Sequence, residues 1–336
     1  MTIGERPIYW LARALIALLQ AMPLRWTARL GRAGGGLAYW LDARHRRVAL
    51  DNLSRAFGAG KSAQEIRKLA RENFRRLGES YCCAIKTAAM SWKELKEHIE
   101  FEGLEKLRPP GENQPSRVMA IGHFGNFELY TRANNVVPGF QFATTYRALR
   151  QPALDKLLVE LRARSGCLLF ERRKDSEALR AAMGRERLLI GFLSDRHAGM
   201  GGVVVPFFGR LCSTTAAPAV FAVRYKAPLH AAICYRTRLA HWRIEVGDEI
   251  PTQQDGQRRS SEDIMLDVNR TFEAAIRRDP ANWFWVHKRW KPIPSKAQPH
   301  PAPKRAEAVA PQSAKSETRN PKSEIEPVAT PGQHPR

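Results

Sequence analysis

The sequence lacks the signals of several common function classes. Neither a GxxxxGK[ST] phosphate loop nor a GxGxxG dinucleotide pattern occurs in its 336 residues, which argues against nucleotide chemistry. The five cysteines form no CxxC pair and no Cys/His pair at zinc spacing, and none adjoins a histidine. They predict reduced, buried thiols, with neither a metal site nor a catalytic cysteine. We expect no cofactor.

A long hydrophobic run is also missing. The apolar stretch Ile8–Met22 is shorter than the ~20 residues that a spanning helix needs, and Pro23 ends it. No basic segment precedes it and no A-x-A site follows it, so a cleaved signal peptide is not expected. Because Trp10 and Trp26 suit a lipid–water interface, residues 1–42 predict an interfacial or marginally spanning membrane anchor. The alternative is an amphipathic helix packed on the domain's own core.

Acidic residues are few. There are 33 Asp and Glu against 55 Lys and Arg, a formal net charge of +22. Such a surface fits nucleic acid, an anionic membrane leaflet or an acidic protein. No helix-turn-helix, RNP, KH or zinc-finger pattern is present, so a basic nucleic-acid-binding protein remains only a remote alternative and we expect no nucleic-acid partner.

The organisation of the chain changes twice. Residues 43–107 show helical spacing of apolar residues, as in Ala63 to Tyr81. After Pro110, strands and helices alternate, which predicts an α/β fold with a central, mostly parallel or mixed sheet flanked by helices. Expected strands are Arg117–Ile121, Gln141–Tyr146, Cys167–Phe170, Leu188–Leu193, Leu229–Tyr235 and Trp242–Val246. Expected helices are at about 127–135, 152–164, 176–184, 214–226 and 261–278.

The last part of the chain differs in composition from the rest. Residues 295–336 are rich in proline, alanine and lysine and contain no aromatic residue. Because such a segment buries too little apolar surface to fold, it predicts a disordered tail. The predicted catalytic domain therefore covers residues 43–294.

One segment carries candidate chemistry. An apolar strand is expected to end at Gly122, so His123 follows it at the strand's carboxyl edge, where α/β proteins place their sites. Asn126 is suited to cap the next helix, and Glu128 falls in its first turn. His-x4-Glu spacing lets a carboxylate reach one imidazole nitrogen while the other faces a substrate. Alone the spacing is weak, because about one such match is expected by chance in this chain.

Further motifs follow in a fixed order, and together with His123–Glu128 they resemble the late acyltransferases of lipid A biosynthesis (the lauroyl and myristoyl type). This family is related to the glycerolipid acyltransferases that share the His-x4-acid motif. The resemblance covers about residues 5–292. The other matching pieces are Asn52-Leu53 with Ala56-Phe57, Tyr146-Arg147, Arg162 with Arg164, Asp195, Pro206–Gly209 with Thr214-Thr215, and Trp285–Lys291.

The resemblance implies an acyl carrier protein thioester as donor and a hydroxyl of a lipid A precursor as acceptor. Carried over, His123 is the general base and Glu128 its carboxylate helper, with Asp195 as a second candidate for that role. Arg164, Arg162 and Arg147 become candidates for binding the acceptor's phosphates or the oxyanion. The alternative for the acceptor is another glycolipid or phospholipid.

The resemblance also implies a location and a fold. The enzyme is expected at the cytoplasmic face of the inner membrane, attached peripherally or through an N-terminal anchor. Its sheet is expected to resemble that of glycerol-3-phosphate acyltransferases. Two segments stay open: Val203–Phe208 as part of an acyl tunnel or as a buried strand, and Trp283–Lys291 as a membrane-facing rim or as a segment folded over the core.

Overall fold

The computed structural model describes residues 5–107 and 115–293. The chain divides after Gln298, and every described residue belongs to the first compact unit. The tail predicted at residues 295–336 lies outside the described residues.

A seven-stranded sheet forms the centre of this unit. All neighbouring strands run parallel except β8 and β9, which run antiparallel. The mixed sheet predicted from the sequence is therefore confirmed. Its strand order is β1 (Ile99–Glu102), β9 (His241–Glu249), β8 (Leu229–Arg238), β2 (Arg117–Ile121), β5 (Leu188–Leu193), β3 (Gln141–Tyr146) and β4 (Leu168–Glu171).

Both faces of the sheet are covered by other elements. This explains why the sequence of the central strand β2 is apolar. Val118 and Ala120 point into one hydrophobic cluster, while Met119 and Ile121 point into a second cluster on the other face. Because successive side chains of a strand alternate between faces, a strand buried on both sides needs an uninterrupted apolar run.

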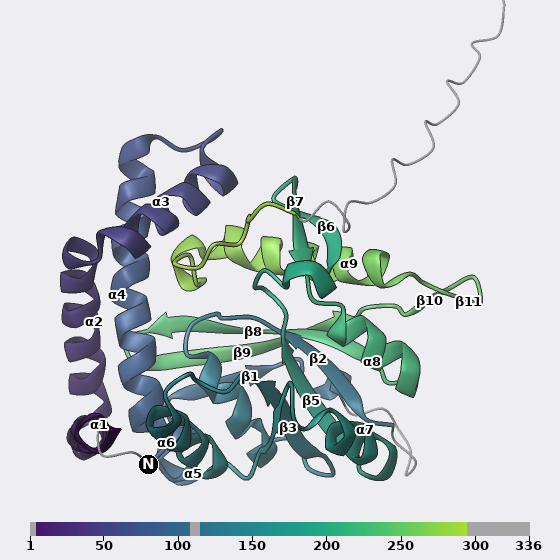
Figure 1. Cartoon of the computed structure of the whole chain (residues 1–336), viewed down its shortest axis with the longest axis horizontal. Coiled ribbons are helices and arrows are strands. Elements are labelled where there is room, and N and C mark those ends of the chain that lie inside the picture. Colours follow the sequence, from purple (N-terminus) through teal and green to yellow (C-terminus); the bar gives the residue numbers. More distant parts are fainter. Residues whose placement is uncertain (1–4, 108–114, 294–336) are drawn as a thin grey trace, which may run out of the picture. The chain divides into compact units, whose positions relative to one another are not determined.

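Helices and a hairpin supply these covers (Figure 1). Helix α9 (Ser261–Arg278) and the hairpin of β6 (Val203–Phe207) and β7 (Arg210–Thr214) lie on one side of the sheet, and α5 (Trp92–Leu95) and α6 (Pro152–Ala163) lie on the other. The remaining elements are α7 (Ser176–Arg185), α8 (Ala217–Tyr225), the two-residue strands β10 (Gln253–Gln254) and β11 (Gln257–Arg258), and the 3-10 helices η1 (Leu104–Leu107), η2 (Phe127–Asn135), η3 (Gly199–Gly201) and η4 (Pro280–Asn282).

Four N-terminal helices stand beside the sheet: α1 (Glu5–Ala21), α2 (Leu24–Leu41), α3 (Ala43–Phe57) and α4 (Ala63–Thr87). Glycines let α2 and α4 touch backbone to backbone. A Cβ at Gly35 would stand 2.1 Å from the carbonyl oxygen of Phe74, and one at Gly78 would stand 2.1 Å from that of Gly31. No larger residue fits these positions without separating the helices.

The sequence predicted six strands close to their observed bounds, but it missed others. Residues 43–107 were expected to be helical, whereas Ile99–Glu102 forms β1 and pairs with β9. A four-residue strand is too short to show alternation against a helical background. The hairpin of β6 and β7 was also missed as a unit. Within residues 5–107 and 115–293, no helix combines the length and the apolar character needed to cross a bilayer.

We predict that Gly35→Val lowers the stability of the protein. The added side chain overlaps the α4 backbone, and overpacking of this kind costs about 1–3 kcal/mol of unfolding free energy. The urea midpoint of purified protein, followed by circular dichroism, measures the change.

Gly34→Ala is the matched control, because a Cβ at Gly34 meets nothing within 4 Å. Alanine favours helix over glycine, so this variant should keep or raise the midpoint. Equal midpoints for Gly35→Val and the wild type would contradict close α2–α4 packing.

Candidate functional site

The candidate site lies at the carboxyl ends of the central parallel strands. After β2 the chain forms β3 and β4 on one side, returns to place β5 directly beside β2, and then places β8 on the other side of β2. The strand order therefore reverses around β2. In open α/β sheets the crevice beyond the strand ends at such a point is where ligands bind.

His123 and Asp195 meet at this point. Each follows its strand closely, and the pairing of Ile121 with Leu193 brings the two strand ends level. The Nδ1 atom of His123 lies 2.7 Å from Oδ1 of Asp195, and the backbone N–H of His123 donates to Oδ2 at 2.8 Å. The carboxylate is therefore bound to both the ring and the main chain of the same histidine.

A tryptophan completes the carboxylate's shell. The indole Nε1–H of Trp283 donates to Oδ2 of Asp195 at 2.8 Å. A backbone bridge between Phe124 and Trp283 places the indole there. Gly125 makes the turn with φ of +49°, and a Cβ at this residue would stand 2.6 Å from the carbonyl oxygen of Cys234. Glycine is needed at this turn for both reasons.

Asp195 is charged although it is fully buried. Burial alone raises its pKa, but the charge and hydrogen bonds of His123, with a smaller contribution from His287, hold the pKa of this carboxyl well below its usual range. The neutral ring of His123 must then carry its proton on Nδ1, because a carboxylate only accepts. Its Nε2 has no hydrogen-bond partner among the described residues, and the side chain is 10% exposed.

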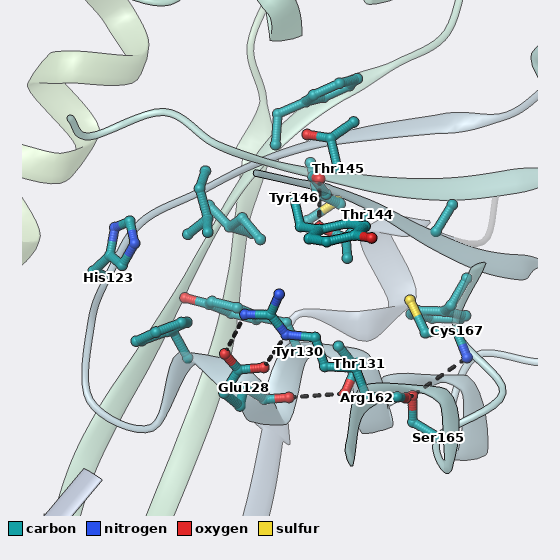
Figure 2. A pocket seen from close by; sticks show the side chains of 18 of the residues that line it. His123, Glu128, Tyr130, Thr131, Thr144, Thr145, Tyr146, Arg162, Ser165 and Cys167 are labelled. Carbon is teal, nitrogen blue, oxygen red and sulfur yellow. Dashed lines mark hydrogen bonds and ion pairs between the residues drawn. The ribbon is translucent and has the colours of Figure 1, made fainter. Parts of the chain in front are cut away.

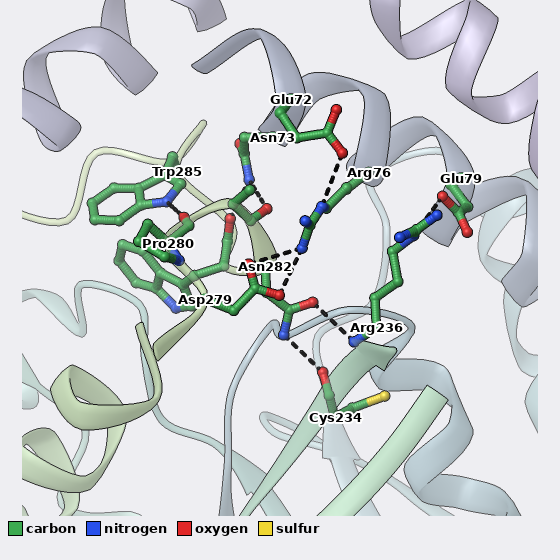
Figure 3. A network of polar contacts seen from close by, with 12 residues as sticks. Glu72, Asn73, Arg76, Glu79, Cys234, Arg236, Asp279, Pro280, Asn282 and Trp285 are labelled. Atoms are coloured by element: carbon green, nitrogen blue, oxygen red, sulfur yellow. Dashed lines mark hydrogen bonds and ion pairs between the residues drawn. The ribbon is translucent and has the colours of Figure 1, made fainter. Parts of the chain in front are cut away.

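The segment that carries Trp283 is fastened by α3 and α4. The Asn52 side chain donates to the carbonyl oxygens of Trp285 and His287, and Asn73 donates to those of Ala281 and Trp283. Figure 3 shows the neighbouring contacts, in which Arg76 of α4 binds both carboxylate oxygens of Asp279 at 2.6 and 2.8 Å. Packing of the N-terminal helices therefore sets the position of the Asp195 donor.

A second charge is buried close by. Arg289 is fully buried and donates to the carbonyl oxygen of Ser213 and to Oγ1 of Thr214. Burial lowers the pKa of this arginine, and the nearby Asp195 charge opposes that effect. Burial also lowers the pKa of His287 to about 4, so this histidine is neutral at pH 7. Arg289 therefore offsets part of the Asp195 charge without a direct ion pair.

Glu128 does not contact the imidazole in the way that the sequence predicted. Its carboxylate receives two hydrogen bonds from Arg162, at 2.5 and 2.8 Å, as Figure 2 shows. The prediction that Glu128 reaches the imidazole is therefore wrong for Nδ1, which Asp195 occupies. Asn126 precedes η2 as expected for a cap, but its buried side chain makes no hydrogen bond to any residue that the structure describes.

A cavity of about 1070 Å³ opens beside His123. Its volume is at the upper end of the roughly 300–1,000 Å³ of small-molecule pockets. The cavity runs under the sheet, where apolar side chains of β2, β3, β5 and β9 line it together with residues of α1, α4 and α6. Glu128 and Arg162 also line it, so they share the cavity with His123 without contacting its ring nitrogen Nδ1 (Figure 2).

The two remaining predicted arginines lie in different places. Arg147 is exposed and lines the cavity mouth, whereas Arg164 is exposed and does not line the cavity. Of the two alternatives for Trp283–Lys291, the structure supports a segment folded over the core and not a membrane-facing rim, because Trp283, Trp285 and Arg289 are fully buried.

The tunnel proposed for Val203–Phe208 is not found. Val205 and Phe207 are buried in β6, and no residue of that segment lines the cavity. No sequence pattern predicted the hydrogen bond between Trp283 and Asp195. The only hint in the sequence was the clustering of aromatic and basic residues near the end of the folded part.

Comparisons with known proteins find relatives that share one activity in their names. Lipid A biosynthesis palmitoleoyltransferase of Escherichia coli (strain K12) is 25% identical over 301 residues, which cover 86% of this chain and 93% of the relative. A lipid A biosynthesis acyltransferase of Haemophilus influenzae is 26% identical over 304 residues, covering 87% and 93%. Lipid A biosynthesis lauroyltransferase of Escherichia coli (strain K12) is 24% identical over 295 residues, covering 85% and 92%.

The family model for bacterial lipid A biosynthesis acyltransferases matches residues 3–292, nearly the whole folded part. The resemblance noted in the sequence motifs is thereby confirmed. This chain belongs to the bacterial lipid A biosynthesis acyltransferase family and is an acyltransferase.

Proposed function

We propose that this enzyme moves a fatty acyl chain from an acyl carrier protein thioester to a hydroxyl of a lipid A precursor, with His123 as general base. The observation that carries the proposal is the buried Asp195 carboxylate on Nδ1 of His123, beside a long apolar cavity. The names of the relatives support the acceptor, since they are lipid A acyltransferases.

The proposed step uses the free ring nitrogen. Nε2 of His123 takes the proton of the acceptor hydroxyl while the hydroxyl oxygen attacks the thioester carbonyl. The tetrahedral intermediate then collapses, the C–S bond breaks, and the imidazolium returns the proton to the leaving thiolate. Asp195 stabilises the imidazolium, because the two charges lie 2.7 Å apart in a buried setting. No covalent acyl-enzyme is needed.

Glu128 and Arg162 remain in the proposed catalytic set in a different role from the one first assigned. Their ion pair stands in the cavity wall next to the base, and Arg162 donates from Nε and Nη2. Nη1 of Arg162 is left for a ligand, since it has no hydrogen bond to any described residue. We propose that Glu128 fixes this guanidinium so that Nη1 faces the substrate.

The cavity fits an acyl chain. Its inner part is lined by Met119, Phe142, Leu189 and Val246 on the underside of the sheet. Met119 lies four residues before His123, and at ~3.3 Å per strand residue the slot extends roughly 13 Å from the base. An apolar chain entering this slot leaves its thioester carbonyl near Nε2.

The N-terminal helices supply a surface for membrane contact. Ten of the fifteen exposed large apolar side chains in the described part belong to α1 and α2, which marks this face as unlike the rest of the surface. Leu11, Leu15 and Leu18 follow one face of α1, and Leu15 also lines the cavity. Helix α2 adds three arginines and no acidic residue.

We therefore propose that α1 and α2 lie in the interface of an anionic leaflet and that lipids reach the cavity past α1. The inner membrane at its cytoplasmic face remains the proposed location.

We predict that His123→Ala lowers the rate of acyl transfer by at least ~10²-fold, because the general base is lost. Asp195→Asn should cause a loss of similar order, because the amide no longer fixes the Nδ1–H tautomer or balances the imidazolium. Purified enzyme, lipid A precursor and acyl carrier protein thioester are combined, and mass spectrometry measures the acylated product.

A second His–Asp pair gives the matched control. His45 and Asp42 are bonded at 2.6 Å on the protein surface, away from the cavity. The variants His45→Ala and Asp42→Asn should keep near-normal turnover. Normal turnover of His123→Ala would refute the mechanism, and acylation only of another glycolipid or phospholipid would refute the acceptor.

We predict that the double variant Leu11→Ser/Trp40→Ser binds anionic vesicles at least ~10-fold more weakly than the wild type, because even partial burial of two large apolar side chains, each worth about 1.5–3 kcal/mol when fully buried, contributes more than the 1.4 kcal/mol that a tenfold change requires. Co-sedimentation with vesicles of phosphatidylglycerol and phosphatidylethanolamine measures the binding.

The control Met200→Ser/Leu211→Ser removes two exposed large apolar residues from elsewhere on the surface. It should bind like the wild type. If both double variants bind alike, α1 and α2 are not the contact surface.

A further inference from the structure

The mouth of the cavity carries more positive charge than the mechanism uses. Five cationic side chains line the cavity, are exposed, and form no ion pair with any residue in the described ranges: Arg147, Arg172, Arg180, Arg196 and Lys291. Elsewhere several exposed arginines pair with carboxylates, as Arg277 does with Glu273 and Arg278 does with Glu245. We call these five residues the cationic rim.

Sheet topology explains why they gather. Arg196 follows β5, Arg147 follows β3 and Arg172 follows β4, and these three strands are neighbours that run parallel. At ~4.8 Å between strands, Arg147 and Arg172 lie roughly 10 and 14 Å across the sheet from β2, the strand of His123. Arg180 comes from α7 and Lys291 from the end of the folded part.

The acidic groups at the rim are already engaged. The Glu171 carboxylate accepts hydrogen bonds from the backbone N–H groups of Ala148, Arg173 and Lys174, and Asp175 accepts one from the N–H of Glu171. They hold the loops after β3 and β4 in place and form no ion pair with the rim. The positive charge of the rim is therefore available to a ligand.

We infer that the cationic rim binds a phosphoryl group carried by one of the substrates, roughly two to three strand spacings from β2, the strand of His123. Arginine forks match the oxygens of a phosphate, and several cations suit its near-double negative charge. This inference rests on the proposed function, and it replaces Arg164 as a phosphate ligand. The phosphoryl group belongs to the lipid acceptor or to the phosphopantetheine arm of the donor.

The test is the double variant Arg147→Gln/Arg172→Gln. Its matched control is Arg150→Gln/Arg173→Gln, which removes the same two charges from exposed neighbours that do not line the cavity. The rim variant should lose roughly 10-fold or more in kcat/KM, because charge-assisted hydrogen bonds to phosphate are lost. The control should stay near the wild-type value.

Phosphate-free substrates identify the source. If the loss disappears with a phosphatase-treated lipid acceptor, the acceptor supplies the phosphoryl group. If it disappears with an acyl N-acetylcysteamine thioester, the donor supplies it. Equal kcat/KM for the two double variants, or a loss that persists with both phosphate-free substrates, overturns the inference.

Calorimetric titration of the full chain with inorganic pyrophosphate adds a readout that needs no turnover. The rim variant should bind pyrophosphate at least ~10-fold more weakly than the control variant. Equal affinities would overturn the inference that the cationic rim binds a phosphoryl group. If the wild-type protein binds pyrophosphate through the cationic rim but acylates no lipid, the proposed function is contradicted and the inference about the rim is not.

Discussion

The site depends on one buried charge, the carboxylate of Asp195. Placing an ionised carboxylate where water is excluded is costly unless hydrogen bonds and an opposite charge compensate it. Here His123 provides two contacts, Trp283 a third, and the buried Arg289 an electrostatic contribution without an ion pair. Because these groups come from distant parts of the chain, the base is oriented only when the whole fold is in place.

The N-terminal helices connect this charge to the rest of the molecule. Close contact between α2 and α4 at Gly35 and Gly78 fixes α4, and α4 holds the segment of Trp283 through Asn73 and Arg76. Helices α1 and α2 of the same bundle present the exposed apolar face proposed for membrane contact. One bundle thus supports the donor to Asp195 on its inner side and, in our proposal, meets the lipid on its outer side.

Much of the sheet could be predicted from the sequence, because a strand buried on both faces must be an apolar run between turn residues. Gln141–Tyr146 and Leu188–Leu193 match their predicted bounds. The sequence left two candidate partners for the imidazole, Glu128 and Asp195, and could not decide between them. Glu128 is five residues from His123 but turns to Arg162, whereas Asp195, 72 residues away, arrives through the parallel pairing of β2 with β5. Motif spacing shows which residues are close along the chain. It does not show which strands pair, so it could not predict that Asp195 would lie beside His123.

The most direct test of this account is the tautomer of His123. Nitrogen NMR of protein labelled at histidine, with the signal assigned through its loss in His123→Ala, distinguishes a proton on Nδ1 from one on Nε2. Because the Asp195 carboxylate accepts from Nδ1, we expect the Nδ1–H form for the neutral ring, with Nε2 unprotonated. A neutral ring protonated on Nε2 would contradict it, because the nitrogen facing the cavity would then be unable to accept the substrate's proton.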